Sequence, residues 1–171
     1  IQEELGNKLR IGSSLNNIGR MYSDKGDLDT ALDYYERSLV IKEELGNKSG
    51  MGYSLANIGS VHHDKGDYDT ALDYLEKSLA IQKEIGLGGE LPLWTNTYLY
   101  LTYKNLGKEY DVKEINSLIK ETEHIVFDLN YRLFQLLEDN SYLKTAYNQI
   151  QELADNLEPD VAAKFLSYPI P

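Results

Sequence analysis

The sequence predicts an all-α protein, built as an α-solenoid of stacked antiparallel helix hairpins. Residues 1–40 and 41–80 align without a gap and share 26 identical residues. Apolar residues within each unit recur at the three- and four-residue spacing of one helix face. A single hairpin cannot bury its apolar face alone, whereas stacked hairpins can, so we expect a superhelix with a concave and a convex side.

Each 40-residue unit is predicted to hold two helices joined by a tight turn. The turn falls at Asp-Lys-Gly-Asp, residues 24–27 and 64–67. Gly26 and Gly66 suit the left-handed residue that follows a helix end, and Asp27 and Asp67 suit the N-cap of the next helix.

The junctions between units follow the same logic. Gly6 and Gly46 are predicted to end a second helix, and Asn7 and Asn47 to cap the helix that follows. Each unit would then begin and end at a capped boundary.

Glycines in the middle of the first helices indicate close helix packing. Gly19 and Gly59 recur at the same position, although glycine in a helix costs about 1 kcal/mol relative to alanine. We expect a close helix–helix approach there, with Ala31 and Ala71 as the small partners on the second helices.

The second half of the chain follows the period less closely. The sequence divides into two near-identical units over 1–86, a degenerate third repeat over 87–126, and a degenerate C-terminal helix pair with a capping helix over 127–171. Predicted helices cover 94–107, 112 onward, 142–157 and 160–167, with Pro159 in the first turn of the last. A break is expected near Asp128–Asn130, with one long helix over 111–138 as the alternative. Residues 138–140 form the next predicted turn.

Composition and charge exclude several classes of function. The net charge is -11, with 17 basic and 28 acidic side chains. Such a chain is a poor candidate for binding nucleic acid or an anionic membrane, because both require clustered cations. There is no cysteine, which excludes disulfides and thiolate metal sites.

No apolar run approaches the length of a membrane span, so a cytoplasmic location is the default expectation. The chain starts without methionine, which suggests a fragment of a longer protein.

No residue pattern indicates catalysis or a bound cofactor. His62-His63-Asp64 looks like a metal site, but neighbouring helix residues point about 100° apart and two such imidazoles do not readily share one ion. The aspartates at 24, 27 and 29 lack the glutamate that a calcium loop needs at its twelfth position. No phosphate-binding loop or nucleophile motif is present. We therefore predict a non-enzyme without cofactor or metal.

The repeated residues resemble the tetratricopeptide repeat family. The resemblance is carried by Leu15, Ile18, Gly19, Tyr22, Gly26-Asp27, Ala31 and Tyr35, and again by Leu55, Ile58, Gly59, His62, Gly66-Asp67, Ala71 and Leu75. The usual unit has 34 residues, and this one has 40. The longer unit is similar to the repeats of kinesin light chains, of the Leu-Gly-Asn-repeat spindle-orientation adaptors and of bacterial signalling proteins.

The resemblance implies a protein-binding groove on the concave side, lined by the first helix of each repeat. The matching positions of this sequence are Ser13, Asn16, Asn17, Arg20, Asp24, Tyr53, Asn57, Ser60, His63, Asp64, Trp94 and Tyr98. Asn17 and Asn57 recur one unit apart, and amide side chains can satisfy a peptide N–H and C=O together. We expect them to hold the backbone of a bound segment.

The expected function is binding of a protein or peptide in this groove. Two alternatives stay open: a sensory or regulatory segment of a bacterial signalling protein, such as a kinase, ATPase or cyclase fusion, and a structural scaffold that self-associates through exposed terminal repeats.

Overall fold

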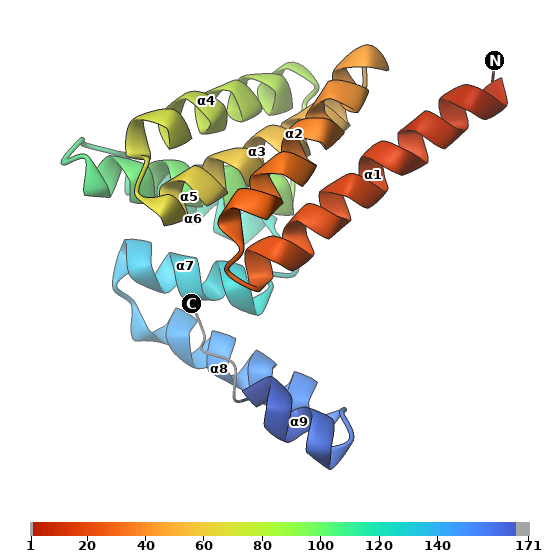
Figure 1. Cartoon of the computed structure of the whole chain (residues 1–171). Helices are drawn as coiled ribbons and strands as arrows, with labels where there is room; N and C mark the ends of the chain where they lie inside the picture. The colour runs from red at the N-terminus through yellow and green to blue at the C-terminus, as the bar shows by residue number, and fades with distance from the viewer. Residues whose placement is uncertain (1, 167–171) are drawn as a thin grey trace. The chain divides into compact units, whose positions relative to one another are not determined.

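A computed structural model describes residues 2–166, and within them the side chains of residues 5–163. This part of the chain is all-α, as predicted, and contains no strand. The helices are α1 (Gln2–Asp24), α2 (Leu28–Glu44), α3 (Lys48–Lys65), α4 (Tyr68–Glu84), α5 (Glu90–Asn105), α6 (Val112–Glu121), α7 (Phe127–Leu137), α8 (Asn140–Asp155) and α9 (Pro159–Leu166) (Figure 1).

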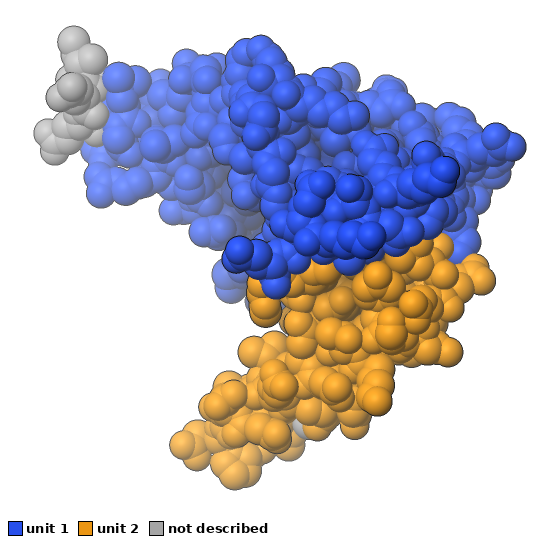
Figure 2. Space-filling view, turned by 180° about the vertical axis from the view of Figure 1, so that it is seen from behind, with its two compact units in different colours: residues 1–123 blue, residues 124–171 orange. Residues whose placement is uncertain are grey.

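The helices fall into two compact units, residues 1–123 and 124–171, which Figure 2 shows in different colours. In the first unit α1 pairs with α2 and α3 with α4, and α3 also packs on α2. α5 then packs on α3 and α4 in the way that α3 packs on α1 and α2. The second unit consists of α7 packed on α8, with α9 against α8.

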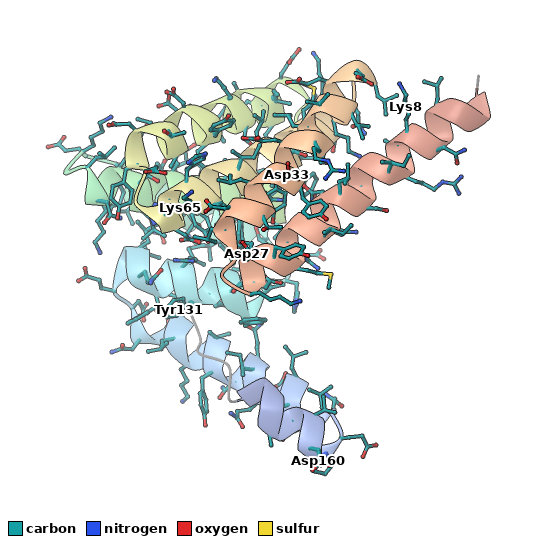
Figure 3. The ribbon with its side chains drawn as sticks, in the orientation of Figure 1. Lys8, Asp27, Asp33, Lys65, Tyr131 and Asp160 are labelled. Atoms are coloured by element: carbon teal, nitrogen blue, oxygen red, sulfur yellow. The ribbon has the colours of Figure 1, made fainter. Side chains whose placement is uncertain are left out.

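The turns within the hairpins have the predicted left-handed glycines, but only one of the two predicted aspartate caps forms. Gly26 and Gly66 lie in the left-handed region, with φ of 79° and 83°. Asp27 lies at the turn between α1 and α2 (Figure 3), where its Oδ1 accepts a hydrogen bond from the backbone N–H of Thr30 at 3.3 Å. Asp67 makes no such cap, and its carboxylate lies 3.4 Å from Nδ1 of His62 instead.

The junction between the first two repeats is also as predicted, but the junction expected at Gly6–Asn7 is wrong. Gly46 has a φ of 60°, and Oδ1 of Asn47 accepts from the backbone N–H of Gly50 at 2.9 Å. Gly6 and Asn7 instead lie inside α1, which continues through them. No hairpin of the described chain packs before α1, so no tertiary contact favours a turn over continued helix at that point.

The two helices of each hairpin approach closely at a glycine of the first helix. A Cβ added to Gly19 would lie 2.8 Å from the ring of Tyr35 and 3.2 Å from the carbonyl oxygen of Ala31. A Cβ added to Gly59 would lie 2.7 Å from Cγ of Leu75. Ala31 is therefore a partner of Gly19 as expected, while the larger Tyr35 and Leu75 fill most of the space that the missing side chains leave.

Buried hydrogen bonds repeat where neighbouring helices meet. The Ser38 hydroxyl donates to the carbonyl of Gly12 at 2.7 Å, and the Ser78 hydroxyl donates to the carbonyl of Gly52 at the same distance. All four groups need partners because they are out of water. The serines therefore fix the register of α2 on α1 and of α4 on α3.

The second half differs from the prediction in where its helices begin and end. α5 begins at Glu90, four residues before the predicted start, after Gly89 with a φ of 87°. The break expected near Asp128–Asn130 is wrong, because α6 ends at Glu121 and α7 begins at Phe127. The turn expected at 138–140 is present at residues 138–139, with Glu138 left-handed at a φ of 58°, and α8 begins at Asn140, two residues before the predicted helix at 142. Ser167, the predicted end of the last helix, lies outside the described residues.

The close approach at Gly59 predicts opposite effects for two glycine-to-alanine substitutions in α3. Gly59→Ala should destabilise the protein by about 1–3 kcal/mol, because its methyl group overlaps the buried Leu75. Gly52→Ala should stabilise it by up to about 1 kcal/mol, because the nearest atom lies 3.7 Å away and alanine favours the helix. Urea unfolding followed by circular dichroism measures both, and equal effects of the two changes would contradict this packing.

Candidate functional site

A strip of polar residues runs along α1 and α3, the first helices of the two repeats. On α3 it consists of Tyr53, Asn57, Ser60 and Asp64, and on α1 of the equivalent Ser13, Asn17, Arg20 and Asp24. The spacing of four, three and four residues places each set on one side of its helix. We call these eight residues the polar strip.

The strip is the side of α3 that its neighbouring helices leave most open. Tyr53 is 47% exposed, Asp64 is exposed and Asn57 is half-buried, whereas most other residues in the middle of α3 are buried. Ser60 is buried, and its hydroxyl donates to the carbonyl of Asn57 at 2.8 Å. The accessible part of the strip on α3 is therefore formed by Tyr53, Asn57 and Asp64.

A side-chain hydrogen bond joins the strip residue Asn57 of α3 to α1. Nδ2 of Asn57 donates to Oδ1 of Asn16 at 3.1 Å. The sequence predicted Asn17 and Asn57 as the recurring amide pair, and in the structure Asn16 is the residue that bonds to Asn57. Asn17 is exposed. The bond holds Asn57 in one orientation and leaves its carbonyl oxygen and second amide proton available.

Ser13 is positioned by a lysine of α2. Nζ of Lys42 donates to the Ser13 hydroxyl at 2.9 Å, and Ser13 donates in turn to the carbonyl of Leu9 at 3.1 Å. Burial lowers the pKa of the Lys42 ammonium below its ordinary value. The Ser13 hydroxyl is therefore engaged with its own hairpin.

Arg20 and Asp24 place two opposite charges next to the hairpin core. The pKa of the Asp24 carboxyl is raised above its ordinary value by partial desolvation, which the nearby Arg20 guanidinium partly offsets. The pKa of the buried Tyr35 phenol is raised by its own burial and further by the charge of Asp24. Both Arg20 and Asp24 are on the surface, so they can meet a ligand.

The remaining predicted residues lie in packing contacts. His63, predicted to face the groove, is buried, with its ring edge-on to Tyr98 at 5.5 Å and to Tyr68 at 5.4 Å. Tyr98 is also buried, and the half-buried Trp94 lies 5.0 Å from it. Nδ1 of His63 lies 3.0 Å from the Thr102 hydroxyl. These aromatic residues connect α3 to α5.

No set of three or more His, Asp or Glu side chains in the described part of the chain is arranged to hold a metal ion. His62 stacks on Tyr74 with 5.7 Å between ring centres, in the same way that Tyr22 stacks on Tyr34 at 5.5 Å in the first repeat. His62 therefore has a packing role at the end of its hairpin.

Within residues 2–166, no helix has the length and apolar character needed to cross a bilayer.

Sequence reasoning missed a hollow on the second unit. It has a volume of about 600 Å³. Its lining residues come from α7 and α8: Phe127, Asp128, Tyr131, Asn140, Leu143, Lys144, Ala146, Tyr147 and Ile150. The four-residue step from Leu143 to Tyr147 was a signal for it, but a step of this kind equally describes a helix face buried in a core.

The geometry defines a helical-repeat protein in which paired helices carry a polar strip on their first members. Residues 2–86 match the sequence model of the tetratricopeptide repeat family. The chain therefore belongs to the tetratricopeptide repeat family, with the match carried by its first half. A comparison with curated proteins found no match. Tetratricopeptide repeats are in general non-catalytic modules that bind other proteins.

The raised pKa of Asp24 predicts that this strip residue lowers the stability of the fold at neutral pH. When the pKa of a carboxyl is higher in the folded than in the unfolded protein, its contribution to stability is fully present below the unfolded pKa, here near 3.8. That contribution is lost as the pH rises through the folded pKa. Asp24 also lies at the C-terminal end of α1, where a negative charge is unfavourable. Asp24→Asn should therefore raise the free energy of unfolding at pH 7 by less than about 1 kcal/mol, since the side chain is partly in water.

Urea unfolding at pH 7 and at pH 3 checks this prediction, because the difference should vanish at the lower pH. Asp33→Asn is the control, since the exposed Asp33 carboxylate accepts from Arg37 at 3.1 Å and gains nothing from neutralisation. A loss of stability in Asp24→Asn at pH 7 would show that Asp24 is a favourable partner of Arg20 instead.

Proposed function

We propose that this protein is a non-catalytic module that binds an extended segment of a partner protein along the polar strip. The observation that carries the proposal is the exposure of Tyr53 beside the amide groups of Asn17 and Asn57 on adjacent helices. An exposed tyrosine offers a large, rigid contact area together with a hydroxyl group, and such residues often carry much of the binding energy of an interface.

The amides suit recognition of a peptide backbone. Asn57 keeps an acceptor oxygen and one N–H after its bond to Asn16, and Asn17 is exposed on the neighbouring helix. Each can form a hydrogen bond to a backbone group whatever side chain the segment carries. Because the Asn57 side chain is already oriented by Asn16, little of its rotamer freedom would be lost on binding.

The charge of the strip favours a neutral or basic segment over an acidic one. Arg20 is the single cation among the eight strip residues, and it lies near Asp24. The chain as a whole has a net charge of -11, which slows the approach of an acidic partner and accelerates that of a basic one. A paired-cation clamp for a terminal carboxylate is not present in the strip.

We further propose that α5 and α6 are a degenerate third repeat and that the module works in the cytoplasm. The first proposal is supported by the way α5 covers α3 and α4. The second is supported by the lack of cysteine, which fits a reducing compartment. A regulatory segment of a signalling protein would use the same strip.

Selection of peptides from a displayed random library, followed by titration calorimetry, tests the proposed function. Peptides selected on the wild-type chain should bind the Asn17→Ala/Asn57→Ala variant at least about fivefold more weakly, because two backbone hydrogen bonds, each contributing roughly 0.5–1.5 kcal/mol, are lost. Tyr53→Ala should weaken them by a similar factor.

Asn16→Ala is the matched control. It removes the bond to Asn57 and makes the position identical to Ala56 of the second repeat, so Asn57 loses its fixed orientation, while the binding groups of Asn17, Asn57 and Tyr53 are all retained. It should weaken peptide binding far less than the double variant. Unchanged binding by a correctly folded Asn17→Ala/Asn57→Ala variant would overturn the proposed site.

A further inference from the structure

The two helices that line the hollow of the second unit are fixed relative to each other. The side-chain amide of Asn130 in α7 donates to the side-chain oxygen of Gln149 in α8 at 3.0 Å, and Gln149 donates to the carbonyl of Ile125 at 2.7 Å. Asn130 is buried, so its amide depends on this bond for a partner. The walls of the hollow are therefore in place before any ligand binds.

Large apolar side chains line this hollow and are left partly in water. Tyr147 is 57% exposed and Leu143 is 38% exposed. Phe127 and Tyr131 of α7 are half-buried, and Tyr131 is labelled in Figure 3. Grooves lined by aromatic rings bind proline-rich segments, because such segments are already extended before they bind. The hollow suits a ligand of this class.

The chain itself contains a segment of this kind. Residues 167–171 read Ser-Tyr-Pro-Ile-Pro, carry no charge and lie outside the described residues. Pro169 and Pro171 have no backbone N–H, so fewer donors would lose water on entering an apolar site. Tyr168 and Ile170 each precede a proline, which disfavours helix and favours an extended backbone. Both features fit a segment that covers an apolar hollow.

The segment begins within reach of the hollow. α9 follows α8 after residues 156–158 and packs against it, so α9 turns back along α8 (Figure 1). The 8 residues of α9 span about 12 Å, roughly half the length of α8, so α9 ends beside the middle of α8, where Tyr147 lies. Five extended residues span about 15 Å more. The hollow needs less, because Leu143 and Ile150 are about 10 Å apart along α8.

We propose that residues 167–171 bind in this hollow of their own chain as an extended proline-rich segment. Tyr168, Ile170 and the two prolines pack against the aromatic and leucine side chains that line it. The segment closes the hollow to any other proline-rich segment, which must displace it in order to bind. The hollow shares no residue with the polar strip, so this inference does not rest on the proposed function.

Amide NMR spectra of the full chain test where the segment lies. Tyr168→Ser/Ile170→Ser, which we call the segment variant, should shift the amide signals of Tyr131 and Tyr147 and leave those of α2 unchanged. The shifts arise because the packed side chains are lost from the hollow. Ser167→Ala is the control, since it keeps Tyr168, Ile170 and both prolines, and it should leave the signals of α7 and α8 in place.

A capped synthetic peptide, Ser-Tyr-Pro-Ile-Pro, tests whether the hollow recognises this sequence. Titrated into the segment variant, it should return the signals of α7 and α8 toward their wild-type positions with saturation. It should bind the wild-type chain at least about tenfold more weakly, because the chain's own segment competes at high effective concentration.

Substitutions in α8 then locate the binding site. Tyr147→Ser, added to the segment variant, should weaken the peptide at least about fivefold, and its exposure means that circular dichroism should show an intact fold. Asn148→Ser is the matched control, because Asn148 is the next residue, is exposed and does not line the hollow. It should leave peptide binding unchanged.

Three results would overturn the proposal. The first is a segment variant whose α7 and α8 signals match those of the wild-type chain. The second is equal binding of the peptide to the wild-type chain and to the segment variant. The third is a wild-type dimer in light scattering that becomes a monomer in the segment variant, which would make the segment of a second copy the occupant.

Discussion

The fold depends on how closely the two helices of a hairpin approach each other at Gly19 and Gly59. A methyl group at either glycine would overlap Tyr35 or Leu75, so the axes can come together only because the first helix has no side chain there. The gain is contact between large apolar side chains of the second helix and the backbone of the first. Once this distance is fixed, the turn at Asp-Lys-Gly-Asp can close with a single left-handed glycine, and the next hairpin stacks in the same register.

Small and polar residues at the junctions convert this packing into a defined register. Ser38 and Ser78 each donate to a carbonyl of the preceding first helix, which would otherwise be an ordinary intrahelical acceptor. A leucine in their place would fill space without specifying an angle. The Ser38 hydroxyl also lies 3.2 Å from the Ser54 hydroxyl of α3. One hydroxyl group of α2 therefore helps to fix the positions of α1, α2 and α3 relative to one another.

The sequence predicts well what depends on neighbours along the chain. Gly26, Gly66 and Gly46 have the expected left-handed backbone, and Asp27 and Asn47 cap the expected helices. It predicts less well what depends on tertiary contacts. Gly6 and Asn7 carry the same letters as Gly46 and Asn47, yet α1 continues through them because no earlier hairpin of the described chain packs there.

The candidate site shows the same division between local and tertiary signals. Helical spacing was sufficient to place Tyr53, Asn57 and Asp64 on one side of α3. It was not sufficient to show that His63 would be buried against Tyr98 or that Asn57 would bond to Asn16, because both facts depend on side chains from another helix. The position of a residue in its repeat predicts the direction in which its side chain points. Whether that side chain is free to bind a ligand depends on the residue that faces it from the neighbouring helix.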